Sequence, residues 1–383
     1  MLHRYTVFFV ACALPLLFIG QVAPNMAREL DFWLLWVVAM ALVGLPVLFA
    51  EFALSARSAD MPWQGMQKLT READASIAWR GFALLSVVVA ILISANISGR
   101  IALGAAAQFP SAFQSSGIPM AGIAAGLSVI AVILSLLKTR LLLVGVLLIL
   151  LGSLLSLFDS SVSVPVMTEV SLGEWSRAVI LALLCVAVGT GLYWFDGMAT
   201  APGVMQTKKS LAGYILPVWM TQLIFGSLAI LAGSSMVTIP SFVVTSLGML
   251  LISAFLLHYA SVQLMARFGI VAAAVVLVLA ILFSIVPVQM TLIVIICLSL
   301  AAVLMLSIFS GFVMKISHLR KTLNLSSEMR YNLWRVLVRI VVPIAIIIGT
   351  FVANYFFDVN IMLLVLLDGI LGLLFMRDAK YNK

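Results

Sequence analysis

The sequence predicts an all-α integral membrane protein with twelve transmembrane helices. We expect a 5+5 inverted repeat with broken helices 1 and 6, followed by two C-terminal helices. Three observations lead to the twelve spans, namely the composition, the length of the apolar runs and the distribution of Lys and Arg, whereas the repeat is predicted from the positions of glycine and proline given below. The chain of 383 residues is 64% hydrophobic and 9% charged, and its mean hydropathy is +1.23. Soluble domains carry about 25% charged residues, so this composition excludes a soluble domain.

The apolar runs define the predicted spans. About 20 apolar residues are needed to cross about 30 Å of hydrocarbon. The runs of sufficient length are 5–24, 31–56, 79–107, 119–137, 139–158, 175–203, 211–234, 241–266, 269–286, 289–315, 332–356 and 359–376. Only short hydrophilic segments separate them, so residues 1–383 are expected to form one polytopic, transporter-like domain. The two largest hydrophilic pieces, 56–79 and 315–331, are expected to be amphipathic and to lie at the inner membrane surface.

The positions of the basic residues give the topology. Of the 22 Lys and Arg residues, only Arg28 and Arg177 fall in outer segments when the N-terminus is placed inside, and Arg100 falls within a span. Because cytoplasmic loops carry the excess of Lys and Arg, we expect both termini in the cytoplasm and a multi-pass protein of the plasma (inner) membrane. The net charge of +8 is thus a topology signal, and nucleic-acid binding is unsupported.

One carboxylate, Glu51, lies inside an apolar span in the stretch VGLPVLFAEFALSAR, residues 43–57. An ionisable group at a helix centre costs about 2.5–3.5 kcal/mol, so it normally has a partner and a role. Gly44 and Pro46 precede it and are expected to loosen the helix there. Glu51 either ties two helices together or acts directly in transport, and it is expected to bind the free amides of an unwound segment.

Breaks are predicted in two equivalent spans. Helix 1 carries Pro15, Gly20 and Pro24, and helix 6 carries glycines and a proline in VAVGTGLYWFDGMATAPG, residues 186–203. Interrupted helices at matching positions of two halves indicate the central site of a transporter. Each of these helices opens a five-helix half, so we expect inverted repeats at about 5–158 and 175–315, with helices 11 and 12 at about 332–376.

These residues resemble a known family, the neurotransmitter:sodium symporters. The stretch GLPVLFAEFAL, residues 44–54, resembles the helix-2 signature of the family, with Gly44, Pro46 and Glu51 in place. Gly189-Thr190-Gly191 resembles the glycine pair of the family's unwound helix 6. Trp334, Arg339 and Pro343 match its W-x4-R-x3-P pattern near the start of helix 11. The chain is therefore similar to a divergent, shortened bacterial-type member of that family.

The resemblance implies a solute site where helices 1, 3, 6 and 8 meet. The positions it implies for solute binding are Ala13, Leu14, Leu16, Gly189, Thr190, Gly191 and Ser261, and Arg100 is added to them from its position along helix 3. The asparagines and glycines with which helix 1 of the family holds sodium and substrate are absent here, and Val22 stands where the family has its outer-gate arginine. On helix 8, Ser261 is the best counterpart of a Thr-Ser pair that completes a sodium site. Sodium ligation therefore does not carry over.

Three further ionisable residues lie within predicted spans. Arg100 is about 30 Å along helix 3 from Arg80, so it reaches either the central cavity or the outer surface; in the cavity it would bind a substrate carboxylate or pair with Asp196. Asp196 either carries a proton or caps the inner half of helix 6. His258 either couples transport to protons or only donates a hydrogen bond in helix 8.

The sequence therefore favours a secondary active transporter that moves a small amino acid, or a related amine or carboxylate, by alternating access. The alternative is a non-transporting membrane protein, such as a sensor or accessory subunit, that retains the fold. No hydrolase, metalloprotease or nucleotide-binding motif is present, so the protein is not expected to be an enzyme. No cofactor is expected, although a sodium ion or a proton could be the coupling ion. The oligomeric state is left open.

Overall fold

A computed structural model describes residues 6–24, 29–159, 166–168, 170–186, 191–194, 210–232, 238–325 and 327–348. The elements in these ranges are helical, apart from an isolated parallel β-bridge between Glu29 and Val166. The helices of the first part of the chain are α1 (Thr6–Val22), α2 (Leu30–Ala39), η2 (Met40–Gly44), α3 (Leu45–Ser58), α4 (Pro62–Glu72), η3 (Ile77–Arg80), α5 (Gly81–Gln108), α6 (Pro110–Ser116), α7 (Met120–Ser135) and α8 (Arg140–Asp159). Those of the second part are α9 (Leu172–Val186), α12 (Ala212–Ala232), α13 (Ile239–Phe268), α14 (Val271–Ser284), α15 (Val288–Ile308), η5 (Phe309–Val313), α16 (Ile316–Leu323), α17 (Glu328–Val336) and η6 (Leu337–Val341).

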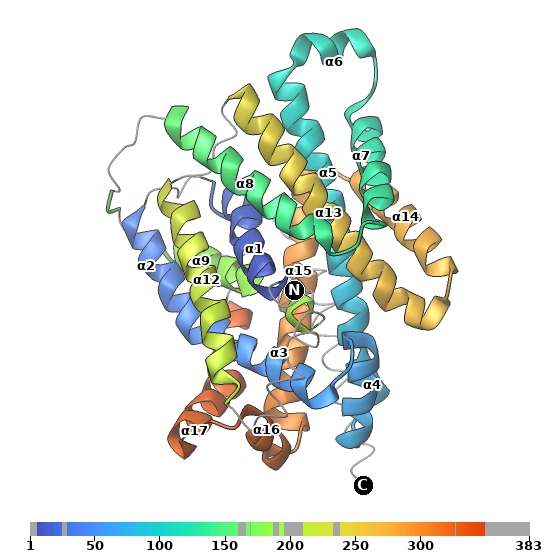
Figure 1. Cartoon of the computed structure of the whole chain (residues 1–383). Coiled ribbons are helices and arrows are strands. Elements are labelled where there is room, and N and C mark those ends of the chain that lie inside the picture. The colour runs from blue at the N-terminus through green and yellow to red at the C-terminus, as the bar shows by residue number, and fades with distance from the viewer. Residues whose placement is uncertain are drawn as a thin grey trace.

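The helices follow the predicted spans closely. Within the described part, six helices are long and apolar enough to cross a membrane, and four shorter apolar helices accompany them. The predicted span 359–376 lies outside the described residues. The two hydrophilic segments contain the short helices α4 and α16, which lie with α17 at one end of the molecule, opposite α6 (Figure 1). We call this the basic end, and the charge pattern predicts that it faces the cytoplasm.

Helix 1 differs from the prediction. Instead of a break, α1 runs without interruption from Thr6 to Val22 with Pro15 inside it. A proline removes one hydrogen bond, but it does not unwind a helix whose neighbours favour helix formation and packing. Leu16, Leu17 and Phe18 follow Pro15 here, and they are bulky apolar residues without the conformational freedom of glycine. The region 187–190, where the break in helix 6 was expected, lies outside the described residues.

The predicted loosening of helix 2 is confirmed. A π-helical turn, Met40–Gly44, separates α2 from α3, and the N–H of Leu45 bonds to the carbonyl of Met40. Pro46 follows at the start of α3 and has no N–H to continue the regular ladder. Gly44 lets α9 approach closely, because a Cβ there would lie 3.0 Å from Val186 Cγ2. The π-helical turn therefore changes the rotation of α3, which carries Glu51, relative to α2.

Two glycines set the crossing of α8 over α13, which is visible in Figure 1. A Cβ at Gly248 would lie 2.7 Å from the carbonyl oxygen of Gly145, and a Cβ at Gly145 would lie 2.9 Å from that of Gly248. The two backbones are therefore in direct contact. Small residues allow this kind of approach, and it gives close van der Waals packing between helices in a membrane.

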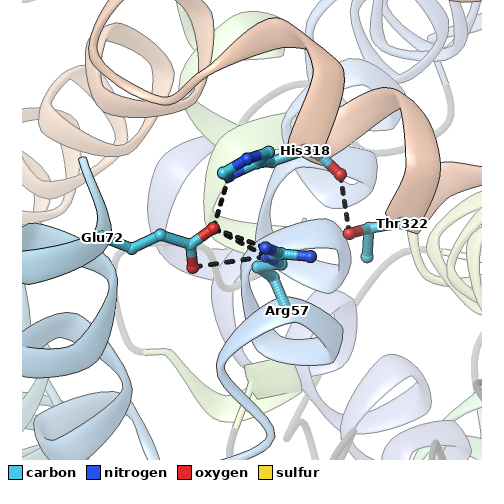
Figure 2. Close-up of polar contacts among 4 residues, drawn as sticks. All are labelled: Arg57, Glu72, His318 and Thr322. Carbon is cyan, nitrogen blue, oxygen red and sulfur yellow. Dashed lines mark hydrogen bonds and ion pairs between the residues drawn. The ribbon is translucent and has the colours of Figure 1, made fainter.

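At the basic end, one carboxylate joins three helices (Figure 2). Glu72, the last residue of α4, accepts hydrogen bonds from Arg57 Nη2 at 2.6 Å and from Arg57 Nε at 3.0 Å. Nδ1 of His318, from α16, lies 2.5 Å from the same Glu72 oxygen. The hydrogen bonds from Arg57 hold the pKa of Glu72 below its usual value, although partial burial opposes them. This cluster fastens α4 and α16 to the end of α3.

The contact between Gly145 and Gly248 predicts a strong effect of a single methyl group. We expect Gly248→Ala to lower the free energy of unfolding by about 1–3 kcal/mol, because two backbones must separate. Gly126→Ala is the matched control, since no atom lies within 4 Å of a Cβ at Gly126. Thermal unfolding of the purified protein in detergent measures both. Equal stability of the two variants would contradict the close crossing.

The Glu72 cluster predicts a pH-dependent contribution to stability. Because the pKa of Glu72 is lowered in the folded state, its carboxylate stabilises the fold above the usual value of 4.5 and ceases to do so as the pH falls below that value. Glu72→Gln should therefore cost about 1 kcal/mol at pH 7 and less at pH 3. Thermal unfolding at both pH values tests this. Glu328→Gln, which removes the more exposed Arg320–Glu328 pair, should cost less. A cost of Glu72→Gln that persists at pH 3 would refute the prediction.

Candidate functional site

The carboxylate of Glu51 is fully buried, and its partner is a backbone amide. Its Oε1 accepts a hydrogen bond of 2.9 Å from the N–H of Trp194, and its exposed fraction is 0%. Trp194 belongs to the short described segment 191–194 that follows α9 in sequence. An unpaired amide in an apolar interior costs several kcal/mol, so this bond satisfies a group that the helix start leaves free.

Trp194 is held at three further points, on α3, just beyond α3 and on α5. Its carbonyl accepts a hydrogen bond of 3.2 Å from Ser55 Oγ, one turn after Glu51 on α3. Its indole Nε1 donates to the carbonyl of Asp60 at 2.9 Å, just beyond α3. The ring also packs against Phe82 of α5, with centroids 5.9 Å apart. The segment 191–194 is thus attached through Trp194 to one turn of α3, at Glu51 and Ser55, and to Asp60 beyond its end.

The same segment contains a residue that must be glycine. Gly191 has a φ of +62°, a conformation that side chains rarely adopt. A Cβ there would lie 3.0 Å from the hydroxyl of Tyr259, on α13. Two residues later, the hydroxyl of Tyr193 accepts a hydrogen bond of 2.6 Å from Gln222 Nε2, on α12. Gln222 also donates to the carbonyl of Cys185 at 3.3 Å, and therefore ties the end of α9 to the segment that follows.

Helices α5 and α13 are joined beside this segment by hydroxyl groups. Ser94 and Ser253 are 2.6 Å apart at their hydroxyls, and the hydroxyl of Tyr259 donates to Ser86 at 3.4 Å. The sequence analysis missed Ser253 and Tyr259. Their only signal is that each is a hydroxyl residue on an apolar helix, and that signal is shared by many residues that face lipid or bond to their own helix.

Arg100 points towards helix 1. Its Nη1 donates a hydrogen bond of 2.9 Å to the carbonyl of Leu17, in the second half of α1. The side chain is partly buried. The guanidinium therefore contacts the second half of α1, and its place in a central cavity stays a prediction.

The other predicted positions contribute less. Ala13 and Leu14 are buried and Leu16 is half-buried on the continuous α1, so their backbone groups belong to a helix and are not freed by a break. Ser261 donates to the carbonyl of Leu257 in its own helix at 2.8 Å. His258 is partly buried on α13.

Three predicted site residues, Gly189, Thr190 and Asp196, lie outside the described residues. Among the residues that are described, no group of three or more His, Cys, Asp or Glu side chains could hold a metal ion. The site that can be described is therefore a hydrogen-bonded junction of α1, α3, α5, α13 and the segment 191–194. Oε1 of its carboxylate accepts from a backbone amide, whereas Oε2 is buried without a hydrogen-bond partner among the described residues, and Arg100 donates one hydrogen bond to a helix carbonyl.

Comparisons with known proteins identify the fold. No protein-family model and no curated protein sequence matches the chain. Among solved structures, the chain is similar to MhsT, crystallised in complex with L-phenylalanine, with a TM-score of 0.64 and 15% sequence identity. The match covers 91% of this chain and 98% of MhsT. MhsT has the LeuT fold of membrane transporters. The chain described here therefore has the LeuT fold.

Proposed function

We propose that this protein is a secondary active transporter that moves a small amino acid or related solute across the membrane by alternating access. It would be a divergent relative of the neurotransmitter:sodium symporters, with inverted repeats at about 5–158 and 175–315. The LeuT fold supports the transporter class. The resemblance in helix 2 and the amino acid bound to MhsT support the solute class. Both termini would lie in the cytoplasm, and the membrane would be the plasma (inner) membrane.

The observation that carries the proposal is the bond between Glu51 and Trp194. In a transporter of this fold, helices 1, 2, 6 and 7 would rock against the remaining helices. Here helix 1 is α1, helix 2 runs from α2 to α3, helix 6 includes α9 and the segment 191–194, and helix 7 is α12. Glu51 on α3 holds the segment 191–194, and Gln222 on α12 holds both Cys185 and Tyr193. These contacts would make helices 2, 6 and 7 move as one body. A buried carboxylate is costly in hydrocarbon, and this role accounts for its presence.

The second candidate is a non-transporting sensor or accessory subunit with the same fold. The continuous α1 favours it, because a helix 1 without a break frees no more backbone groups for a solute or an ion than the one hydrogen bond that Pro15 removes. The coupling ion is left to experiment: Ala13 and Leu14 provide no side-chain oxygen, and Ser261 is bonded to its own helix. Sodium coupling is therefore not part of the proposal.

Uptake of radiolabelled amino acids into proteoliposomes separates the two candidates. We expect uptake that concentrates at least one amino acid and that is abolished when the driving gradient is collapsed. Imposing sodium and proton gradients separately identifies the coupling ion. Saturable ligand binding without flux under any gradient would overturn the transporter proposal and favour the sensor.

Substitution of Glu51 tests the coupling between helices 2 and 6. Glu51→Leu leaves the Trp194 amide without an acceptor, at a cost of about 1–3 kcal/mol, so initial uptake should fall at least about tenfold. Glu51→Gln keeps one acceptor oxygen, so its initial uptake should fall less than that of Glu51→Leu. Uptake per correctly folded protein in proteoliposomes is the measurement, with Ser284→Ala as control, because Ser284 bonds within its own helix at 2.8 Å. Full uptake by Glu51→Leu would refute the proposed role.

A further inference from the structure

The carbonyl of Leu17 accepts hydrogen bonds from two polar side chains that belong to different helices. Arg100 Nη1 reaches it from α5 at 2.9 Å, and Gln21 Nε2 reaches it from the next turn of α1 at 3.2 Å. Because both donors bond to one oxygen atom, the guanidinium and the amide are neighbours. They lie beside the outer half of α1, away from the basic end according to the predicted topology.

The guanidinium has donors to spare and no counter-ion in the described part of the chain. An arginine side chain has five N–H donors, and the described contacts of Arg100 consist of the single bond to Leu17. The ion pairs among the described residues join Arg57, Lys68, His318 and Arg320 to carboxylates, and none of them includes Arg100. A cation in an apolar interior is stabilised by an anion, and the fork geometry matches a carboxylate.

The neighbouring amide has an acceptor to spare. Since Leu17 offers a carbonyl, the amide of Gln21 must turn its nitrogen towards it, which leaves Oε1 facing elsewhere. Oε1 is buried and has no hydrogen-bond donor among the described residues. A buried acceptor without a donor destabilises the fold, and a ligand that brings a donor would remove that destabilisation.

A purely structural role for Arg100 does not require its charge. Gln21 already bonds to the Leu17 carbonyl, and Arg177 from α9 bonds to the carbonyl of Val22, the last residue of α1, at 3.1 Å. A neutral donor at position 100 would serve the same carbonyl without the energetic cost of placing a charge in a span. The charge and the unused donors therefore point to a ligand.

We propose that Arg100 and Gln21 form a subsite for a zwitterionic solute, in which the guanidinium binds a carboxylate and Gln21 Oε1 accepts a hydrogen bond from an ammonium group. The inference rests on the proposed transport function and narrows its solute class to amino acids, excluding simple amines and simple carboxylates. The carboxylate and the ammonium of an α-amino acid are attached to one carbon atom and are therefore close together. The guanidinium of Arg100 and the amide of Gln21 are likewise close together, because both bond to the carbonyl of Leu17. Arg100 supplies affinity for the anion, and Gln21 discriminates against solutes without the ammonium group.

Binding to the purified protein tests this independently of flux. The probes are L-phenylalanine, phenethylamine and 3-phenylpropionate, and the corresponding set built on L-leucine, with isopentylamine and 4-methylpentanoate. Ligand-dependent thermal shifts give a dissociation constant for each. We expect at least one amino acid to bind at least about tenfold more tightly than both of its analogues, since each lost charge–partner contact is worth at least about one factor of ten.

Variants of Arg100 and Gln21 show which of the two residues binds the carboxylate and which binds the ammonium group. Arg100→Gln should reduce the affinity for the amino acid to about that for the amine, and Gln21→Leu should reduce it to about that for the acid. Arg100→Lys keeps the charge and should retain part of the preference, which covers the case in which Arg100→Gln does not fold. Arg177→Gln is the control for the loss of a cation near α1 and should leave the preference unchanged.

Three results would overturn the subsite: no saturable binding of either amino acid, equal affinity for an amino acid and its analogues, or an unchanged preference in both Arg100→Gln and Gln21→Leu. Amino acid binding with the expected preference but without flux would leave the subsite intact and refute transport instead. Flux of a solute that Arg100→Gln and Gln21→Leu carry as well as the wild type would refute the subsite and leave transport intact.

Discussion

The structure depends on one buried hydrogen bond, in which the carboxylate of Glu51 accepts from the backbone N–H of Trp194. Hydrocarbon cannot satisfy a free amide, so any segment that starts a helix within the membrane needs an acceptor from a neighbour. A carboxylate provides a strong acceptor at the positive end of a helix. The π-helical turn before α3 and the contact of Gly44 with α9 bring that acceptor to the required place.

Elsewhere the spans are tied together by donors that reach helix carbonyls. The indole of Trp219 donates to Met40 and that of Trp334 to Pro46, both at 3.0 Å, where the π-helical turn and the proline interrupt the regular ladder. Arg339 likewise donates to Gly311 in the π-helical turn η5. Lipid gives helices no hydrophobic reason to associate, so such bonds and close small-residue contacts supply specificity. Each irregular turn thus becomes an attachment point.

The sequence was sufficient to predict what depends on local pattern. Apolar runs located the described spans, and the Gly44, Pro46 and Glu51 pattern indicated both the irregular turn and an acid that meets an amide. Contacts between distant helices were not predictable, because the partner of Ser94 is one serine, Ser253, among many on apolar helices. The break in helix 1 was predicted from Pro15, Gly20 and Pro24 and is absent from the helix Thr6–Val22. A proline without neighbouring glycines removes one bond, and the adjoining leucines and phenylalanine pack well as helix.

The continuity of α1 and the position of Arg100 are physically linked. In a broken helix, the free N–H groups at the break provide donors for an anion. In this chain those groups bond within α1, so a bound carboxylate would need donors from elsewhere. Arg100 brings a guanidinium to the carbonyl of Leu17, two residues beyond Pro15. On the proposed function, anion recognition would thus have moved from the backbone of helix 1 to a side chain of α5, and α1 could remain a helix without loss of the carboxylate site.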